Sequence, residues 1–158
     1  MRNYTIRLAR SIADTTVEHI KDTITTALDE GVAIGELRNR IMDVPGWTDD
    51  GIYRRADMIA RTESARAYVE GGIESWEKSG VVAGKEWLLA IGACDFCVAA
   101  SKIMNAELVK LRDVPRGLTK GSVLDLGDGQ MMRLDYSDIG GPPLHPNCRC
   151  DVQPVLME

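Results

Sequence analysis

Residues 142–150 of the chain read PPLHPNCRC, and residues 94–97 read CDFC. These two segments contain all four cysteines of the chain and one of its two histidines. Two thiolates in a C-x-x-C segment can hold one metal ion, and a second pair of ligands from elsewhere in the chain completes a tetrahedron. The sequence therefore predicts a structural zinc site that ties the region around residue 94 to the region around residue 150.

The five candidate ligands are Cys94, Cys97, His145, Cys148 and Cys150, and one zinc ion takes four of them. His145 and Cys148 have the spacing of a zinc knuckle. Cys148 and Cys150 lie two residues apart, so they would share one face of an extended segment. The spacing leaves open an all-cysteine set or three cysteines with the histidine, and the fifth group would then hydrogen-bond to a ligand.

Two other interpretations of the cysteines are open. They can be buried thiols that bind no metal, because cysteine often behaves as a small apolar residue. The C-x-x-C pair can also be a redox pair, but a thioredoxin-like motif needs a βαβ setting that the surrounding sequence does not favour. A thiolate-rich zinc site is usually closed and structural. We accordingly expect Asp95 to form a turn and His19 to lie on a solvated helix surface.

Length and composition are those of a globular protein. The 158 residues can bury one sizeable core, and 44% of them are apolar and 27% charged. The net charge of −5 opposes broad attraction to phosphate, as nucleic-acid binders usually carry a basic surplus. No stretch approaches the roughly 20 apolar residues of a membrane span, and residues 1–10 lack the apolar core of a signal peptide. We expect a soluble intracellular protein, in which reduced cysteines favour metal binding over disulfides.

Apolar spacing predicts helices in the N-terminal half. Between residues 11 and 29, apolar side chains recur every three or four positions, and Gly31 ends the pattern. A shorter helix with Ile34, Leu37 and Ile41 on one side follows, and it ends at residues 45–46.

A long helix is predicted from the Thr48 N-cap to the Ser-Gly pair at residues 79–80. Glu63 falls on its apolar stripe, where a carboxylate needs a partner such as Arg61 or Arg66. The functional roles of Arg61 and Glu63 stay open. The three tryptophans, Trp47, Trp76 and Trp87, are expected to be core or interface anchors.

After residue 80 the pattern changes to short elements. Residues 85–91 form an apolar run, residues 97–111 have the spacing of a helix, and residues 122–134 predict a β-hairpin around Gly-Asp-Gly. The predicted fold class is α+β, mainly α: N-terminal helices, one of them long, precede a small zinc-clipped region with a short hairpin. We expect a helical region at 1–80 and a zinc-binding region at 81–158, which packs on the long helix within one continuous domain.

Three features together resemble the phage Mu F-like minor head proteins, also called head morphogenesis proteins. They are the segment IARTE at residues 59–63 of the long helix, Trp87 just before CDFC, and PPLHPNCRC at residues 142–150. The resemblance covers roughly residues 48–154, and residues 142–150 are its most specific part. The N-terminal helices resemble the family only in their general sequence pattern. The chain departs from the family pattern after Cys97, where AASK replaces a glycine-containing turn.

The resemblance implies a low-copy structural component of the phage head, which acts in procapsid assembly at or near the portal. Its partners would be the portal and other head proteins, with contact to packaged DNA left open. No reaction, small-molecule substrate or membrane contact is implied. The protein would be found first in the host cytoplasm and then inside the virion head.

Two alternative functions use the same cysteines and histidine. A small zinc-dependent nuclease or hydrolase is suggested by His145 in a cysteine-rich site, but such an enzyme needs a general base and an open coordination position. A generic zinc-ribbon interaction module outside phage would differ from the head protein only in its partner.

Overall fold

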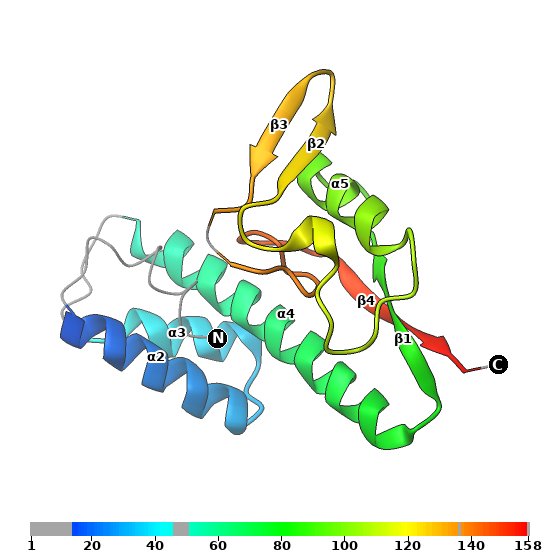
Figure 1. The fold of residues 1–158 in the computed structure, drawn as a ribbon. Helices are drawn as coiled ribbons and strands as arrows, with labels where there is room; N and C mark the ends of the chain where they lie inside the picture. The colour runs from blue at the N-terminus through cyan, green and yellow to red at the C-terminus, as the bar shows by residue number, and fades with distance from the viewer. Residues whose placement is uncertain (1–13, 46–50, 136, 158) are drawn as a thin grey trace. The chain divides into compact units, whose positions relative to one another are not determined.

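The computed structural model describes residues 14–45, 51–135 and 137–157 (Figure 1). It confirms the predicted α+β fold, with helices in the N-terminal half followed by two small antiparallel sheets. The backbone divides into two compact units, Met1–Ala67 and Tyr68–Glu158. The sequence-based division at residue 80 stays a prediction, because compactness alone does not show which segments fold independently. Among the described residues, no helix is both long and apolar enough to span a membrane.

The first unit contains helices α2 (Asp14–Asp29) and α3 (Ile34–Met42) and the N-terminal part of α4 (Ile52–Ser79). Gly31, at a φ of 66°, adopts the left-handed conformation that ends α2 and turns the chain toward α3. The three-and-four spacing read from the sequence is the spacing of the buried faces, since the core consists of Ile20, Ile24, Ala27, Leu37, Ile41, Val44, Ala56, Ile59 and Ala60.

Helix α4 is the predicted long helix. Its 28 residues end where Gly80 takes a φ of 67°. The helix continues through Gly71 and Gly72, so this pair does not interrupt it. The proposed Thr48 cap and the neighbouring Trp47 lie outside the described residues.

Glu63 is buried on α4, with 8% of its surface exposed. Its carboxylate accepts a hydrogen bond of 2.6 Å from Arg66 Nη1, one turn further along the helix. Arg61 lies at the exposed surface and pairs with Asp57 at 2.8 Å. The expectation that Glu63 has an arginine partner is therefore confirmed, and the partner is Arg66.

The second unit contains the two sheets. Strand β1 (Val82–Leu88) pairs antiparallel with β4 (Asp151–Leu156), and β2 (Val123–Gly127) pairs antiparallel with β3 (Gln130–Arg133). The second pair is the predicted hairpin. Its turn has positive φ at Gly127, Asp128 and Gly129, as the Gly-Asp-Gly sequence favours. Helix α5 (Asp95–Met104) and the short 3-10 helix η1 (Arg116–Leu118) connect the sheets, and Figure 1 shows the hairpin beside α5.

One buried cluster holds the second unit together. It joins Val69 and Ile73 of α4 to Trp87 of β1 and to apolar side chains of α5, η1, β2 and β4. Trp87 is 2% exposed, and Trp76 is partly buried against the same cluster. Both tryptophans are thus core anchors, as expected. Their burial supplies much of the apolar contact that a unit with few other aromatic residues needs.

Two features of the second unit differ from the sequence-based expectation. The helix expected within residues 97–111 ends at Met104, and the following loop runs along β1, where Lys85 N–H donates to Val109 O at 2.8 Å. Strand β4 has no counterpart in the sequence-based expectation. It contains Pro154, and proline weakens a strand assignment. These differences place the chain after residue 150 beside β1 rather than in a loop.

Candidate metal centre

The CDFC segment lies at the start of α5. Cys94 is the N-cap residue, with extended backbone angles of −75° and 164°, and Cys97 lies in the first turn of the helix. Val98 N–H donates to Cys94 O at 3.0 Å and closes that turn. Asp95 is exposed in the first turn, where negative charge suits the helix dipole. The helix start thus holds both thiols of the pair at one end of α5.

The HPNC segment at residues 145–148 forms a tight turn ahead of β4. Cys148 N–H donates to His145 O at 3.1 Å, and Asn147 has a φ of 59°. Proline at the second position and a left-handed asparagine at the third are typical of a type II turn. The Pro-Asn pair is thus a turn signal in the sequence, in addition to the spacing of the candidate ligands. It places His145 and Cys148 at the two ends of one turn.

The two segments meet although about fifty residues separate them. His145 Nε2 lies 3.1 Å from Cys94 Sγ and 3.4 Å from Cys97 Sγ. Cys97 Sγ lies 3.6 Å from Cys148 Sγ. Two sets of three ligand atoms, each within 4.8 Å of one another, result: Cys94, Cys97 and His145 form one, and Cys97, Cys148 and Cys150 form the other. All five predicted ligands are therefore in one cluster, and Cys97 belongs to both sets.

Two of these three distances match those between ligands on one tetrahedral zinc ion, and the contact of 3.1 Å between His145 and Cys94 is shorter. Zn–S bonds of about 2.3 Å and Zn–N bonds of about 2.0 Å place sulfur and nitrogen ligands about 3.5 Å apart and two sulfur ligands about 3.8 Å apart. The contacts of Cys97 with His145 and with Cys148 are within about 0.2 Å of these values. The donors are soft thiolates and an imidazole, the set that zinc prefers in structural sites.

His145 is oriented for metal binding. Its Nδ1 lies 2.8 Å from Pro146 O. Because a carbonyl oxygen only accepts hydrogen bonds, Nδ1 carries the proton and the Nε2 lone pair points toward the two sulfurs. A backbone carbonyl that holds the second ring nitrogen of a metal-binding histidine is a common arrangement.

Cys97 and Cys148 are two buried thiols in direct contact. The hydrogen bond between them raises the pKa of Cys97, and burial raises it further. The same hydrogen bond lowers the pKa of Cys148 against the opposing effect of burial, and backbone hydrogen bonds at Cys150 and Leu144 add to the lowering. The contact thus favours a thiolate at Cys148 over one at Cys97. Zinc would replace the shared proton, since coordinated thiols are deprotonated.

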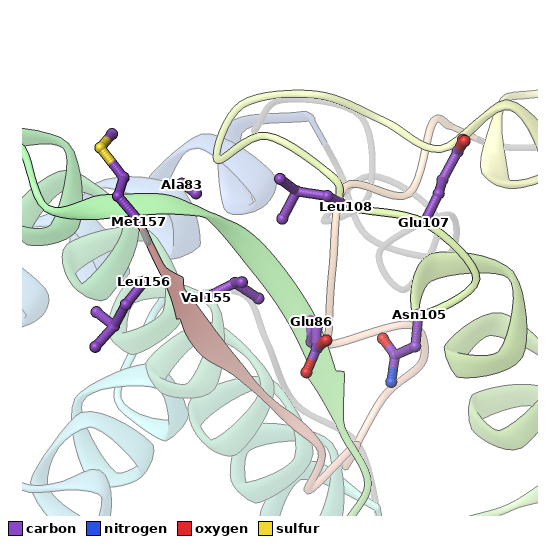
Figure 2. Close-up of a pocket in the computed structure, with 8 residues that line it drawn as sticks. All are labelled: Ala83, Glu86, Asn105, Glu107, Leu108, Val155, Leu156 and Met157. Carbon is purple, nitrogen blue, oxygen red and sulfur yellow. The ribbon is translucent and has the colours of Figure 1, made fainter.

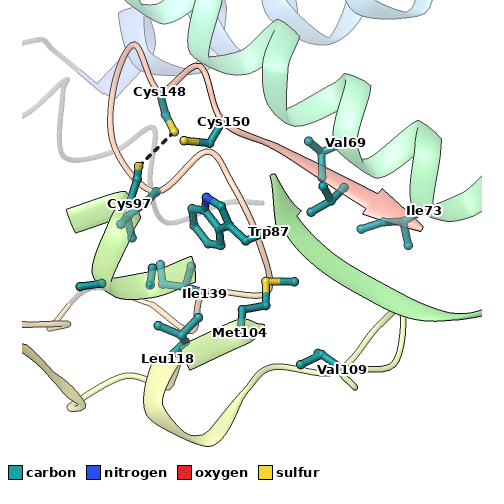
Figure 3. Close-up of a cluster of buried hydrophobic side chains, with 14 of the residues drawn as sticks. Val69, Ile73, Trp87, Cys97, Met104, Val109, Leu118, Ile139, Cys148 and Cys150 are labelled. Carbon is teal, nitrogen blue, oxygen red and sulfur yellow. Dashed lines mark hydrogen bonds between the residues drawn. The ribbon is translucent and has the colours of Figure 1, made fainter. Parts of the chain in front are cut away.

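Three of the four thiols in the cluster are closed to solvent. Cys97, Cys148 and Cys150 are 1%, 5% and 6% exposed, whereas Cys94 and His145 are half-buried. Figure 3 shows the three buried thiols beside the Trp87 ring, in the apolar cluster of the second unit. A metal held there would be part of the core.

Two further expectations concern His19 and the redox interpretation of the C-x-x-C pair. His19 is exposed on α2, in the first unit. The two sheets are both antiparallel, so the βαβ setting of a thioredoxin-like redox pair is not found among the described residues. Cys94 and Cys97 instead share a contact with His145.

Comparison with known proteins identifies one family. A family model described as "Phage Mu protein F like protein" matches residues 18–153, which is most of the chain. The match extends closer to the N-terminus than the resemblance read from the sequence, and it includes most of α2, all of α3 and the five candidate ligands. Comparison with curated proteins and with solved structures gives no match.

Proposed function

The chain belongs to the phage Mu F-like family of head morphogenesis proteins, and from that premise we propose that it is a structural component of the phage head that acts in procapsid assembly. In this proposal the protein carries one structural zinc ion and catalyses no reaction. The zinc joins the start of α5 to the turn that precedes β4.

The convergence of Cys94, Cys97, His145 and Cys148 is the observation that carries the zinc proposal. We infer that these four residues are the ligands. Cys148 is favoured over Cys150 as the fourth because it shares a turn with His145 and lies 3.6 Å from Cys97. Cys150 would then shield the ion and fix the Cys148 thiolate through its backbone.

A structural role suits this centre better than a catalytic one. Metal-dependent hydrolysis needs an open coordination position and a nearby general base, and the metal of nucleases is usually held by oxygen ligands. Across the described ranges, the two sets of candidate ligands contain thiols and an imidazole but no carboxylate. Thiolate-rich zinc sites of this kind stabilise folds, with apparent binding free energies on the order of 10 kcal/mol in small domains.

The proposed partners are the portal and other head proteins, and the proposed location is the host cytoplasm during assembly and then the head interior. The net charge of −5 supports protein contacts over general attraction to packaged DNA. A low copy number is part of the same proposal.

A phage in which this gene is disrupted tests the assembly role. We expect fewer infectious, DNA-filled heads by electron microscopy and plaque titre, and restoration by the wild-type gene in trans. The Cys97→Ser variant should fail to restore assembly, while Lys102→Ser, an exposed change on the same helix, should succeed. Normal heads at normal titre from the disrupted phage would contradict the proposal. So would purified heads that lack the protein by mass spectrometry.

A further inference from the structure

An open groove lies on one face of the β1–β4 sheet, in the second unit. It has a volume of about 420 Å³ and is lined by β1, the C-terminal end of β4 and the loop after α5 (Figure 2). The metal cluster contributes none of its lining residues. The volume is sufficient for a few side chains of a bound peptide.

Three of the apolar side chains that line the groove are largely exposed. Leu108, Leu156 and Met157 are 57%, 64% and 59% exposed, and they lie next to the smaller side chains of Ala83 and Val155. Single exposed apolar residues are common on protein surfaces, but several in one concave surface often mark an interaction site. The groove therefore suits an occupant with aliphatic side chains.

The edge of β4 that faces away from β1 offers few hydrogen-bond donors to an added strand. Pro154 has no N–H, and Val152 N–H already donates to Asp151 Oδ1 at 2.8 Å. These two positions alternate along β4, so their donors would face the same edge. An extended partner consequently gains little by pairing with this edge.

The opposite edge, that of β1, is covered by its own chain. The Asn105 side chain pairs with Trp87, accepting from its N–H at 2.7 Å and donating to its carbonyl at 3.0 Å. Val109 O accepts from Lys85 N–H at 2.8 Å. Gly84 permits this close approach, because a Cβ there would lie 2.4 Å from Val109 O. Because the β1 edge is covered and the β4 edge offers few donors, the face of the sheet is the surface better suited to a partner.

The groove is acidic. Its eight lining residues, all in the described part of the chain, include Glu86 and Glu107 and no lysine or arginine. Gln153 Nε2 donates to Glu86 Oε2 at 2.9 Å and holds that carboxylate above the sheet. A cationic side chain can lay its aliphatic stem against the apolar lining residues while its charged end reaches a carboxylate.

We propose that this groove binds a segment of another head protein in which arginine or lysine side chains alternate with aliphatic ones. The inference rests on the proposed assembly function and adds the chemistry of one partner surface. Apolar contact with Leu108 and Leu156 provides part of the affinity, and the ion pair with Glu86 provides selectivity for a basic segment over an acidic one.

Peptide titration of the zinc-loaded protein, followed by amide chemical shifts in NMR, tests the proposal. The probe is a capped hexapeptide of alternating leucine and arginine. It should bind in the submillimolar range and shift the amides of Ala83, Leu108 and Leu156. A leucine–glutamine hexapeptide and a serine–arginine hexapeptide should each bind at least fivefold more weakly, because each lacks one of the two contributions.

Two double variants distinguish peptide binding in this groove from a general attraction of basic peptides to an acidic protein. Glu86→Gln with Glu107→Gln should weaken the leucine–arginine peptide at least fivefold. Glu18→Gln with Glu74→Gln removes the same charge from exposed helix positions and should change binding less than twofold. Equal effects of the two pairs, equal binding of the serine–arginine peptide, or no shifts in the groove would overturn the inference. Zinc is measured in the same samples, so a protein without zinc would contradict the proposed function separately.

Discussion

His145 Nε2 lies 3.1 Å from Cys94 Sγ, although 51 residues separate the two along the chain. The contact closes a long loop that contains α5, η1 and the β2–β3 hairpin. Closing such a loop costs conformational entropy, and a metal ion that binds residues at both ends can offset that cost.

Removal of zinc is expected to loosen the second unit much more than the first. All five cluster residues lie in Tyr68–Glu158, and the first unit has a separate core. Exhaustive chelation should lower the melting temperature by more than about 10 °C, in keeping with the loss of several kcal/mol. Hydrogen exchange should accelerate in Asp95–Met104 and Asp151–Leu156 more than in Ile34–Met42. An unchanged melting profile would argue against a structural metal.

Serine variants show whether Cys148 or Cys150 is the fourth zinc ligand. Cys148→Ser is expected to lose stoichiometric zinc, because the thiolate itself binds the ion. Cys150→Ser should keep one zinc with affinity lowered by about tenfold, the usual effect of changing a residue that supports a ligand. Competition with a chromogenic chelator measures both. The opposite pattern would make Cys150 the fourth ligand and refute the proposed set.

The purified protein is expected not to cleave DNA, with magnesium or with zinc, because the proposed zinc centre has all four positions filled by three thiolates and an imidazole. A plasmid-nicking assay at increasing protein concentration provides the measurement. The control is His145→Ala, examined by circular dichroism. Cleavage by the wild type that disappears in a folded His145→Ala protein would establish an enzyme and contradict a purely structural role.

Lys85 is expected to make stability depend on pH in the alkaline range. Its side chain is 2% exposed, and burial lowers its pKa, with Arg112 acting in the same direction and Glu70 and Asp113 opposing it. Between the folded pKa and the unfolded value of about 10.4, the unfolded chain binds a proton that the folded chain lacks, so stability rises with pH in that window.

Substitution of that lysine by methionine tests this effect. Lys85→Met should flatten the rise in stability with pH, and at pH 7 it should stabilise the fold by about 1 kcal/mol, because no cation is then buried. Lys110→Met, at an exposed position, is the matched control. Urea denaturation between pH 7 and pH 10 measures both. A strong loss of stability in Lys85→Met at pH 7, absent from the control, would show instead that the buried amine stabilises the fold.

The helices and the metal cluster could be predicted because their signals are local or chemically specific. Ile20, Ile24, Leu37 and Ile41 repeat at the spacing of a helix, and each is buried on its helix. Thiols and imidazoles have few uses when clustered, so their spacing within two short segments predicts that the five residues meet.

The β1–β4 sheet could not be predicted in the same way. Its two strands are more than sixty residues apart, and Pro154 contradicts a strand by the usual rule, although proline is acceptable where its missing N–H faces an outer edge. The choice between Cys148 and Cys150 also depends on tertiary geometry. Spacing of two or of three residues fits different backbones, and Cys148 is favoured only by the turn at Asn147 and the contact with Cys97 in the folded chain.

Metal content of the purified wild-type chain tests the zinc centre most directly. The protein is purified without added metal or a histidine tag and measured by elemental analysis together with native mass spectrometry. One zinc per chain is expected in the wild type, and none in a Cys94→Ser, Cys97→Ser double variant. A folded wild-type protein without zinc, or a double variant that retains one zinc per chain, would contradict the zinc site.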